Sequence, residues 1–411
     1  MNRPQSASPH LGIDFRSNDL QEVFGYVHAG QSIEIIGVGN VGKSNFIQRI
    51  LRRDVQDRYL YEAYQERAHC LFIHLDANSL LEPFPSAMDP NTPSGWPGYE
   101  LMASRLLRAI MENNIVNHIT NTNDPAHPES LYGMYRRLWP DSGNDRVHIV
   151  AFRYLEDLIH RIFAGANYPI RLIFIFDEFE KLLNELPIRF FQSLRSLRDQ
   201  YKDRVLYITT ARQILPLLVP EAHHHLYEPF SELFTNSRHF LLPYGPSDTQ
   251  QTFNRLAARR DLEAPPASLR EQLLAVTGGH GGLVRAGFAA WAPTRLLDDQ
   301  MTDQEVVATM LDIPAVQEEC KTIWASLSND EREVLFEMVR ARQDNRAIAI
   351  KPFGAISRLL IHKGLLLQTN SMAFENIRPL VFAAFLLSAI PPEAQNAAAM
   401  PSFPSNPIIW S

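Results

Sequence analysis

Segment 32–44, SIEIIGVGNVGKS, contains residues suited to binding phosphate at a characteristic spacing. Four residues separate Gly37 from Gly42, and Lys43 and Ser44 follow directly. This is the P-loop pattern, in which backbone N–H groups surround the phosphates of a nucleotide, the lysine reaches the β- and γ-phosphates and the hydroxyl binds Mg²⁺. The candidate binding residues are Gly37, Gly39, Asn40, Val41, Gly42, Lys43, Ser44 and Asn45.

The segments on either side of this loop support the same prediction. An apolar strand is expected before it, at 33–36, and a helix is expected to begin at Lys43. A helix that starts at the loop directs the positive end of its dipole at the phosphates. A chance match is the alternative, and it is weaker because both the strand and the helix are in place.

Two acids follow the most apolar strand predicted from the sequence. Segment 171–176, RLIFIF, is followed by Asp177 and Glu178. The carboxyl ends of parallel strands lie beside the phosphate loop, so Asp177 is predicted to hold Mg²⁺ together with Ser44. Glu178 is predicted to orient and deprotonate the attacking water, which favours ATP hydrolysis over a small-molecule kinase. The alternative is a helix cap with two surface acids.

Further polar residues are candidates for the same site. Thr209, Thr210 and Arg212 end the next apolar strand, where a hydroxyl can sense the γ-phosphate and a guanidinium can stabilise charge in the transition state. Arg238 is a candidate arginine finger that would reach a neighbouring subunit's nucleotide. Arg285, after the glycine-rich segment TGGHGG, is a candidate phosphate contact. An ordinary structural role is the alternative for each of these residues.

Bulk composition is that of an ordinary globular protein. The 411 residues predict two or three domains, and a net charge of −7 does not indicate nucleic-acid binding by the chain as a whole. The two cysteines, Cys70 and Cys320, provide neither a disulfide framework nor a metal cluster and are typical of a reducing compartment. Without a signal peptide or an apolar run long enough to span a membrane, we expect a cytoplasmic protein with no membrane partner.

Apolar strands alternate with amphipathic helices, which predicts an α/β fold with a parallel sheet. Segment 179–201 is expected to form one helix, and His223 to His225 a solvated loop. The predicted domains are a flexible tail at 1–18, a P-loop ATPase core at 19–243 with a long insertion at about 80–145, a helical lid at 244–312, a winged-helix domain at 313–390 and a disordered tail at 391–411.

The winged-helix prediction rests on three helices followed by two short strands near 365–375. Ser328 and Glu331 have the spacing of a capping box that starts the second of these helices. Between residues 315 and 386, nine Lys/Arg against eight Asp/Glu give a net charge of +1, which is weak for DNA binding. Winged helices also contact proteins, so this domain leaves the partner open.

Taken in order, these motifs resemble the AAA+/STAND ATPases, and most closely the bacterial and archaeal STAND-like members, with kinship to origin-recognition-type initiators. Gly281 stands where these families usually have a proline. The ITTAR segment, which ends at Arg212, has one residue more than the TTR sensor of NB-ARC switches. The matching segments are GVGNVGKS, IFIFDE, ITTAR, FLLPYGPSDTQQTF, TGGHGGLVRAGF and the C-terminal helices.

The resemblance implies that ATP or ADP binds with Mg²⁺ between sheet and lid, that the winged helix closes over the nucleotide in an off state, and that nucleotide drives oligomerisation. The leading hypothesis is a switch that hydrolyses ATP and regulates a separate effector protein, in signalling or antiviral defence, as a homo-oligomer or hetero-complex. The alternative is a DNA-associated ATPase (an initiator, loader or transposition regulator) that binds DNA through the winged helix. A nucleotide-locked scaffold with little turnover is a third hypothesis.

Overall fold

The structure is a computed structural model that describes residues 11–81, 94–113, 130–139, 147–292, 296–346, 354–369 and 373–390. Its contacts divide the chain into two compact units, which are described separately below. Unit 1 comprises Met1–Ser17, Gly37–Lys43 and Phe240–Ser411. Unit 2 comprises Asn18–Ile36 and Ser44–His239.

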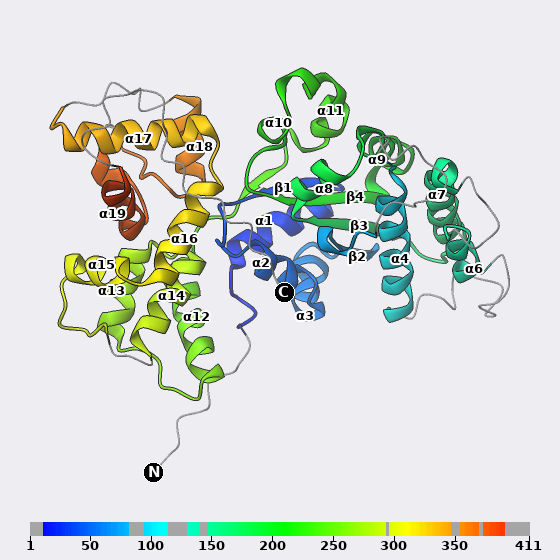
Figure 1. The fold of residues 1–411 in the computed structure, drawn as a ribbon. Helices are drawn as coiled ribbons and strands as arrows, with labels where there is room; N and C mark the ends of the chain where they lie inside the picture. The colour runs from blue at the N-terminus through cyan, green and yellow to red at the C-terminus, as the bar shows by residue number, and fades with distance from the viewer. Residues whose placement is uncertain are drawn as a thin grey trace, which may run out of the picture. The chain divides into compact units, whose positions relative to one another are not determined.

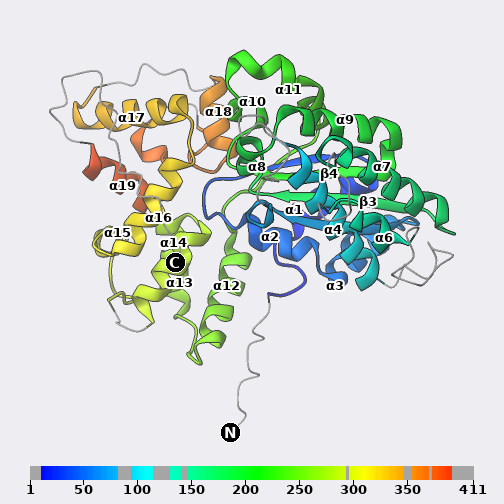
Figure 2. The same ribbon diagram turned by 45° about the vertical axis from the view of Figure 1, so that its right-hand side comes forward.

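Unit 2 is organised around a five-stranded sheet with the strand order β2-β3-β4-β1-β5. The pairs β1–β4, β2–β3 and β3–β4 are parallel, which confirms the predicted α/β fold with a parallel sheet. Helices α4 (Trp96–Glu112) and α9 (Ile188–Tyr201) pack on β2 and β4, and α7 (Val147–Gly165) packs on α4 (Figures 1 and 2). The strands are β1 (Ile33–Ile36), β2 (His69–Asp76), β3 (Ile170–Asp177), β4 (Val205–Ala211) and β5 (Arg238–Phe240).

Both faces of the central strands are buried. Phe174 and Phe176 of β3 belong to one large apolar cluster with α4, α7 and α9. Ile175, between them, is also fully buried and points to the opposite face, because side chains alternate along a strand. On that face, Phe24 of α1 (Ser17–His28) packs edge-to-face on Phe72 of β2, with ring centroids 5.9 Å apart. This burial explains why β3 is an almost continuous apolar run.

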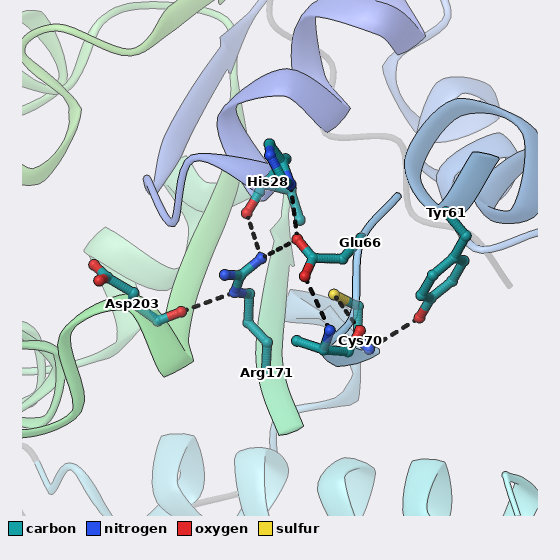
Figure 3. A network of polar contacts seen from close by, with 8 residues as sticks. His28, Tyr61, Glu66, Cys70, Arg171 and Asp203 are labelled. Atoms are coloured by element: carbon teal, nitrogen blue, oxygen red, sulfur yellow. Dashed lines mark hydrogen bonds and ion pairs between the residues drawn. The ribbon is translucent and has the colours of Figure 1, made fainter. Parts of the chain in front are cut away.

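A buried ion pair ties together the amino-terminal ends of β2 and β3 (Figure 3). Arg171 Nη1 donates to Glu66 Oε2 at 2.9 Å and also to the carbonyl oxygen of Val27 at 2.9 Å, while its Nε donates to the carbonyl oxygen of Asp203 at 2.8 Å. His28 Nδ1 lies 2.9 Å from the same carboxylate oxygen of Glu66. One guanidinium therefore holds α1, the entry to β2 and the turn before β4.

We expect Arg171→Met to lower the free energy of unfolding by about 3–5 kcal/mol, because it leaves the Glu66 carboxylate buried without its cation. Burial by itself raises the pKa of Glu66, but hydrogen bonds from the Ala68 N–H and His28, with the charge of Arg171, hold that pKa below its usual value. The carboxylate therefore stabilises the fold above its unfolded pKa, and this stability is lost as pH falls through the lower, folded pKa. Urea denaturation at pH 7 and at acidic pH measures both effects.

The control is Arg108→Met, which breaks an exposed i,i+4 pair with Glu112 on α4. Exposed pairs of this kind contribute about 0.3–0.5 kcal/mol, so this variant should unfold almost as the wild type does. Equal stability losses for Arg108→Met and Arg171→Met would contradict the assigned importance of the buried pair.

Two local expectations in unit 2 are wrong. Segment 179–201 forms two helices, α8 (Phe179–Glu185) and α9, because Pro187 lacks a backbone N–H and disfavours helical backbone at Leu186, which is extended. The histidines expected in a loop are helical: His223 ends a 3₁₀ turn and His224 begins α11 (His224–Ser231). The His224 ring Nε2 lies 2.9 Å from the carbonyl oxygen of Val219.

The part of unit 1 after residue 240 is helical wherever the structure describes it as regular. Ser328 and Glu331 form the predicted capping box of α17, and an unpredicted one begins α15 at Thr302. In place of two wing strands, the described residues show an isolated bridge between Leu366 and Ile377, so the winged helix stays a prediction. The helices are α12 (Pro246–Arg259), α13 (Ala267–Thr277), α14 (Gly281–Trp291), α15 (Asp303–Leu311), α16 (Pro314–Ala325), α17 (Asn329–Gln343), α18 (Ala355–His362) and α19 (Leu380–Ala389).

The tail at 391–411 lies outside the described residues, as do parts of the insertion at about 80–145, whose described residues include α4 and α6 (Leu131–Arg136). Within the described part of the chain, no helix has both the length and the apolar character needed to cross a membrane.

Candidate nucleotide site

The predicted P-loop connects β1 to α2 (Lys43–Ile50) and turns tightly. Asn40 and Gly42 have φ values of +57° and +114°, and only glycine adopts the second readily. A Cβ atom on Gly42 would also lie 2.6 Å from the Tyr244 hydroxyl. Lys43 Nζ donates to the carbonyl oxygens of Gly37 at 2.6 Å and Val38 at 3.1 Å. The lysine is therefore positioned over the loop whose N–H groups are expected to bind phosphate.

His280, the residue before α14, holds this loop from a distant part of unit 1. Its Nδ1 accepts from the Leu283 N–H at 3.4 Å, so Nε2 carries the proton and donates to the Gly39 carbonyl oxygen at 2.8 Å. Burial lowers the pKa of His280 to about 4 against the Gly39 hydrogen bond, with the charges of Arg285 and Lys43 adding to the effect of burial. The ring is thus neutral at pH 7 and fixed in one tautomer.

Helices α14 and α16 also contact the loop at Asn40. The Gly282 N–H donates to the Asn40 carbonyl oxygen at 3.1 Å. The Asn40 side chain donates to Glu319 Oε2 of α16 at 2.9 Å. A Cβ atom on Gly39 would lie 2.6 Å from the Thr322 side chain of α16, so glycine is required there for the close approach. The loop is therefore packed between two helices of its own unit.

Residues 11–17, expected to be part of a flexible tail, also belong to this site. Phe15 is buried and packs edge-to-face on Tyr244, with ring centroids 5.3 Å apart. The Arg16 guanidinium lies 4.6 Å from the centroid of the Tyr244 ring and donates to the carbonyl oxygens of Val41 at 3.1 Å and Leu242 at 3.0 Å. The segment is ordered because its aromatic and cationic side chains fill a gap between the P-loop and the residues before α12.

The two predicted acids of unit 2 have different environments. Asp177, at the end of β3, is buried and accepts a hydrogen bond from the Thr210 hydroxyl at 2.5 Å. Burial by itself raises the pKa of Asp177, but the nearby His74 ring, the Thr210 hydroxyl and the Glu178 N–H hold that pKa below its usual value. Glu178 is exposed. One acid is thus a fixed carboxylate suited to a hard cation such as Mg²⁺, and the other is accessible to water.

Asn78 orients Glu178. Its amide nitrogen donates to Glu178 Oε2 at 3.1 Å and to Asp76 Oδ1 at 2.9 Å, while its amide oxygen accepts from Lys181 Nζ at 2.8 Å. Glu178 itself has left-handed backbone with φ +52° immediately before α8. Its backbone N–H donates to Asp177 Oδ1 at 3.1 Å, while its side chain is exposed.

No protein-family model matches the sequence, and no curated protein matches it. Several solved structures are similar at low sequence identity. A Walker-type ATPase of Pyrococcus abyssi is 15% identical with a TM-score of 0.49, over 93% of this chain and 98% of that one. The Aeropyrum pernix Orc1 protein in complex with DNA is 12% identical with a TM-score of 0.36, over 93% and 94%. Cdc6p of Pyrobaculum aerophilum is 11% identical with a TM-score of 0.30, over 94% and 97%. All three scores lie below 0.5, so these likenesses carry no inference about activity.

The other predicted residues lie as follows. Ser44 is exposed in the first turn of α2, beside the partly buried Asn45. The Arg212 N–H donates to the Glu180 carboxylate. Arg238 Nε donates to Glu34 Oε2 at 3.0 Å.

Glu34 is fully buried, and its burial raises its pKa even though the charge of Arg238 opposes that effect. Arg238 therefore stabilises unit 2 by pairing with the buried Glu34. Its predicted role as an arginine finger for a neighbouring subunit stays a prediction. Thr209 is buried in β4, where it pairs with Glu34 in register.

The residues that the motifs did not predict are Arg16, His280 and Asn78. Each acts on a motif residue from a distant part of the sequence, and each is a common residue type with no fixed spacing to its partner. The histidine between two glycine pairs in TGGHGG is the clearest signal that was available. In the described residues, no group of three or more His, Cys, Asp or Glu side chains could hold a metal ion.

Proposed function

We propose that the chain is a P-loop ATPase of the AAA+ type that binds ATP with Mg²⁺ and hydrolyses it with water. The observation that carries this proposal is the pair of acids at the end of β3, in a chain that also has a complete P-loop pattern. Asp177 is buried, ionised and hydrogen-bonded to Thr210, whereas Glu178 is exposed and held by Asn78. A structural helix cap would not need this division between a fixed and an accessible carboxylate.

The residues present fit the nucleotide and its metal. Backbone N–H groups of the loop and Lys43 are suited to the β- and γ-phosphates. The Ser44 hydroxyl and an Asp177 oxygen are hard ligands of the kind that Mg²⁺ prefers, and the bound metal would neutralise charge on the phosphates. Glu178 takes the proton of the attacking water, and Asn78 orients its carboxylate. Thr210 keeps the Asp177 carboxylate in position.

Phosphate release by the purified full-length chain tests this function. With ATP and Mg²⁺ we expect turnover that stops when EDTA removes the metal, because Mg²⁺ is required to neutralise the phosphate charge. A chain that fails to bind ATP at millimolar concentration would contradict the proposal.

For the molecule on which the ATPase acts, we keep two proposals. One is DNA, as for the Aeropyrum pernix Orc1 protein in complex with DNA. The other is a separate effector protein controlled by a STAND-like switch. Two of the cationic side chains in the described C-terminal part interact within the chain. Lys363 is buried and pairs with Glu331 at 2.6 Å, and Arg378 donates to backbone carbonyls. Arg358 is exposed.

Fluorescence anisotropy with a labelled DNA duplex at 50 and 200 mM salt separates the two proposals. Affinity that falls steeply with salt supports DNA binding, since released counterions drive it. No binding at 50 mM salt contradicts DNA binding. Effector proteins are then sought by pull-down from the native cell extract with and without ATP.

A further inference from the structure

The Asp177 carboxylate lies between side chains from the two strands that flank β3, which are β2 and β4. Its Oδ1 accepts from the Thr210 hydroxyl of β4 at 2.5 Å and from the Glu178 N–H at 3.1 Å. On the β2 side, His74 Nε2 lies 3.7 Å from Oδ2. Two donors therefore hold Oδ1, whereas no group in the described part of the chain donates to Oδ2.

The register of the sheet places the His74 side chain beside this carboxylate. In the pairing of β2 with β3, His74 lies opposite Ile175, and Asp76 lies opposite Asp177. Paired residues point to the same face of a sheet, and side chains alternate along each strand. His74 and Asp177 are therefore diagonal neighbours on one face, in positions that the backbone pairing fixes.

The His74 ring has an unused polar atom. Its Nε2 is buried and has no hydrogen-bond partner among the described residues. An unpaired buried polar atom is unfavourable, and most such atoms in proteins have a partner. A shift of about 0.8 Å would bring Nε2 within the usual hydrogen-bond distance of Asp177 Oδ2. The ring also borders a hollow of about 470 Å³, so it has room for this movement.

We propose that His74 is a positioning residue for Asp177, the proposed Mg²⁺ ligand: its Nε2–H donates to Oδ2 and fixes the carboxylate from the β2 side, as Thr210 does from the β4 side. This rests on the proposed function. A carboxylate oxygen has two lone pairs, so Oδ2 is able to accept an N–H and still bind a cation. Loss of a hydrogen-bond partner of a metal-binding carboxylate typically lowers metal affinity or activity about 10–100-fold.

The test measures ATP binding to the full chain by calorimetric titration, once with Mg²⁺ and once with EDTA. His74→Leu removes the donor and keeps an apolar side chain in its place. We expect it to raise the dissociation constant with Mg²⁺ about 10-fold or more and to leave the constant with EDTA unchanged, because only the metal-dependent part of binding passes through Asp177.

His74→Gln separates the hydrogen bond from the packing of the ring. The glutamine amide nitrogen is able to occupy the place of Nε2 and donate to Oδ2. This variant should bind ATP with Mg²⁺ within about 3-fold of the wild type. A ring that only fills space would be replaced better by leucine than by glutamine, so the opposite order of the two variants identifies a packing role.

His69→Leu is the matched control. His69 is a partly buried histidine of the same strand, and its Nε2 likewise is buried without a hydrogen-bond partner among the described residues. It precedes His74 by five residues, which is about 16 Å along a strand. Its substitution should leave ATP binding unchanged with Mg²⁺ and with EDTA.

An affinity of His74→Leu for ATP with Mg²⁺ within about 2-fold of the wild type overturns this inference and leaves the proposed ATPase intact. So does an equal loss with Mg²⁺ and with EDTA, or an equal loss in His69→Leu, because either would assign the effect to folding. A wild type that binds ATP equally well with Mg²⁺ and with EDTA would contradict metal binding by Asp177 and would overturn both proposals.

Discussion

Lys43→Ala is expected to raise the dissociation constant for ATP by at least about 100-fold, which is the loss of charge-assisted hydrogen bonds to two phosphate groups. In the structure, Lys43 Nζ is held by the carbonyl oxygens of Gly37 and Val38, at 2.6 and 3.1 Å. A bound nucleotide would offer negatively charged oxygens in place of these neutral ones. Isothermal titration calorimetry with ATP and Mg²⁺ measures the change.

Lys321→Ala is the matched control for Lys43→Ala. Lys321 is a partly exposed lysine of unit 1 that pairs with Glu318 on α16 at 2.7 Å, so its loss should leave ATP affinity unchanged. A Lys43→Ala protein that is folded by circular dichroism and binds ATP as the wild type does would refute the assigned site.

Glu178→Gln is expected to retain ATP binding and to lower the rate of phosphate release by about 10²–10⁴-fold, the usual contribution of a general base. The substitution keeps the size and the contact with Asn78 but removes the group that accepts a proton. Single-turnover phosphate release with pre-bound ATP isolates this step from binding.

Glu185→Gln provides the comparison for Glu178→Gln, because Glu185 is an exposed acid at the other end of α8 that pairs with Lys181 at 3.8 Å. It should hydrolyse ATP at the wild-type rate. If the wild type itself releases phosphate only at background and Glu178→Gln does not alter this, the chain is a nucleotide-locked scaffold and not an ATPase.

Local sequence patterns predicted the sheet because they are strongly apolar. The expected strand 171–176 lies within β3, Ile170–Asp177, and the capping box at Ser328 begins α17 as expected. The continuous helix over 179–201 was wrong because apolar spacing outweighed the single proline at 187 in that prediction. The capping box at Thr302 was not predicted, although Thr302 and Glu305 have the same spacing as Ser328 and Glu331.

For the candidate site, the sequence predicted the residues that form contiguous motifs and not those that hold them in position. Gly42 and Lys43 are recognisable because phosphate binding demands their spacing. Arg16 and His280 act through backbone carbonyls of the loop, and any carbonyl can accept such a bond. The roles of Arg16 and His280 depend on the packing of distant segments, and such packing produces no periodic pattern in the sequence. Segment 11–17 appeared to be a tail for the same reason.

At Glu178, which has left-handed backbone, the residue that is best for folding stability differs from the residue proposed for ATP hydrolysis. A non-glycine residue with φ near +52° is strained by about 1–2 kcal/mol, whereas glycine or asparagine accepts this conformation more easily. Replacing Glu178 by glycine or asparagine would therefore raise the free energy of unfolding while removing the proposed base. Selection for heat resistance alone, natural or in the laboratory, would therefore tend to discard the residue that we propose as the base.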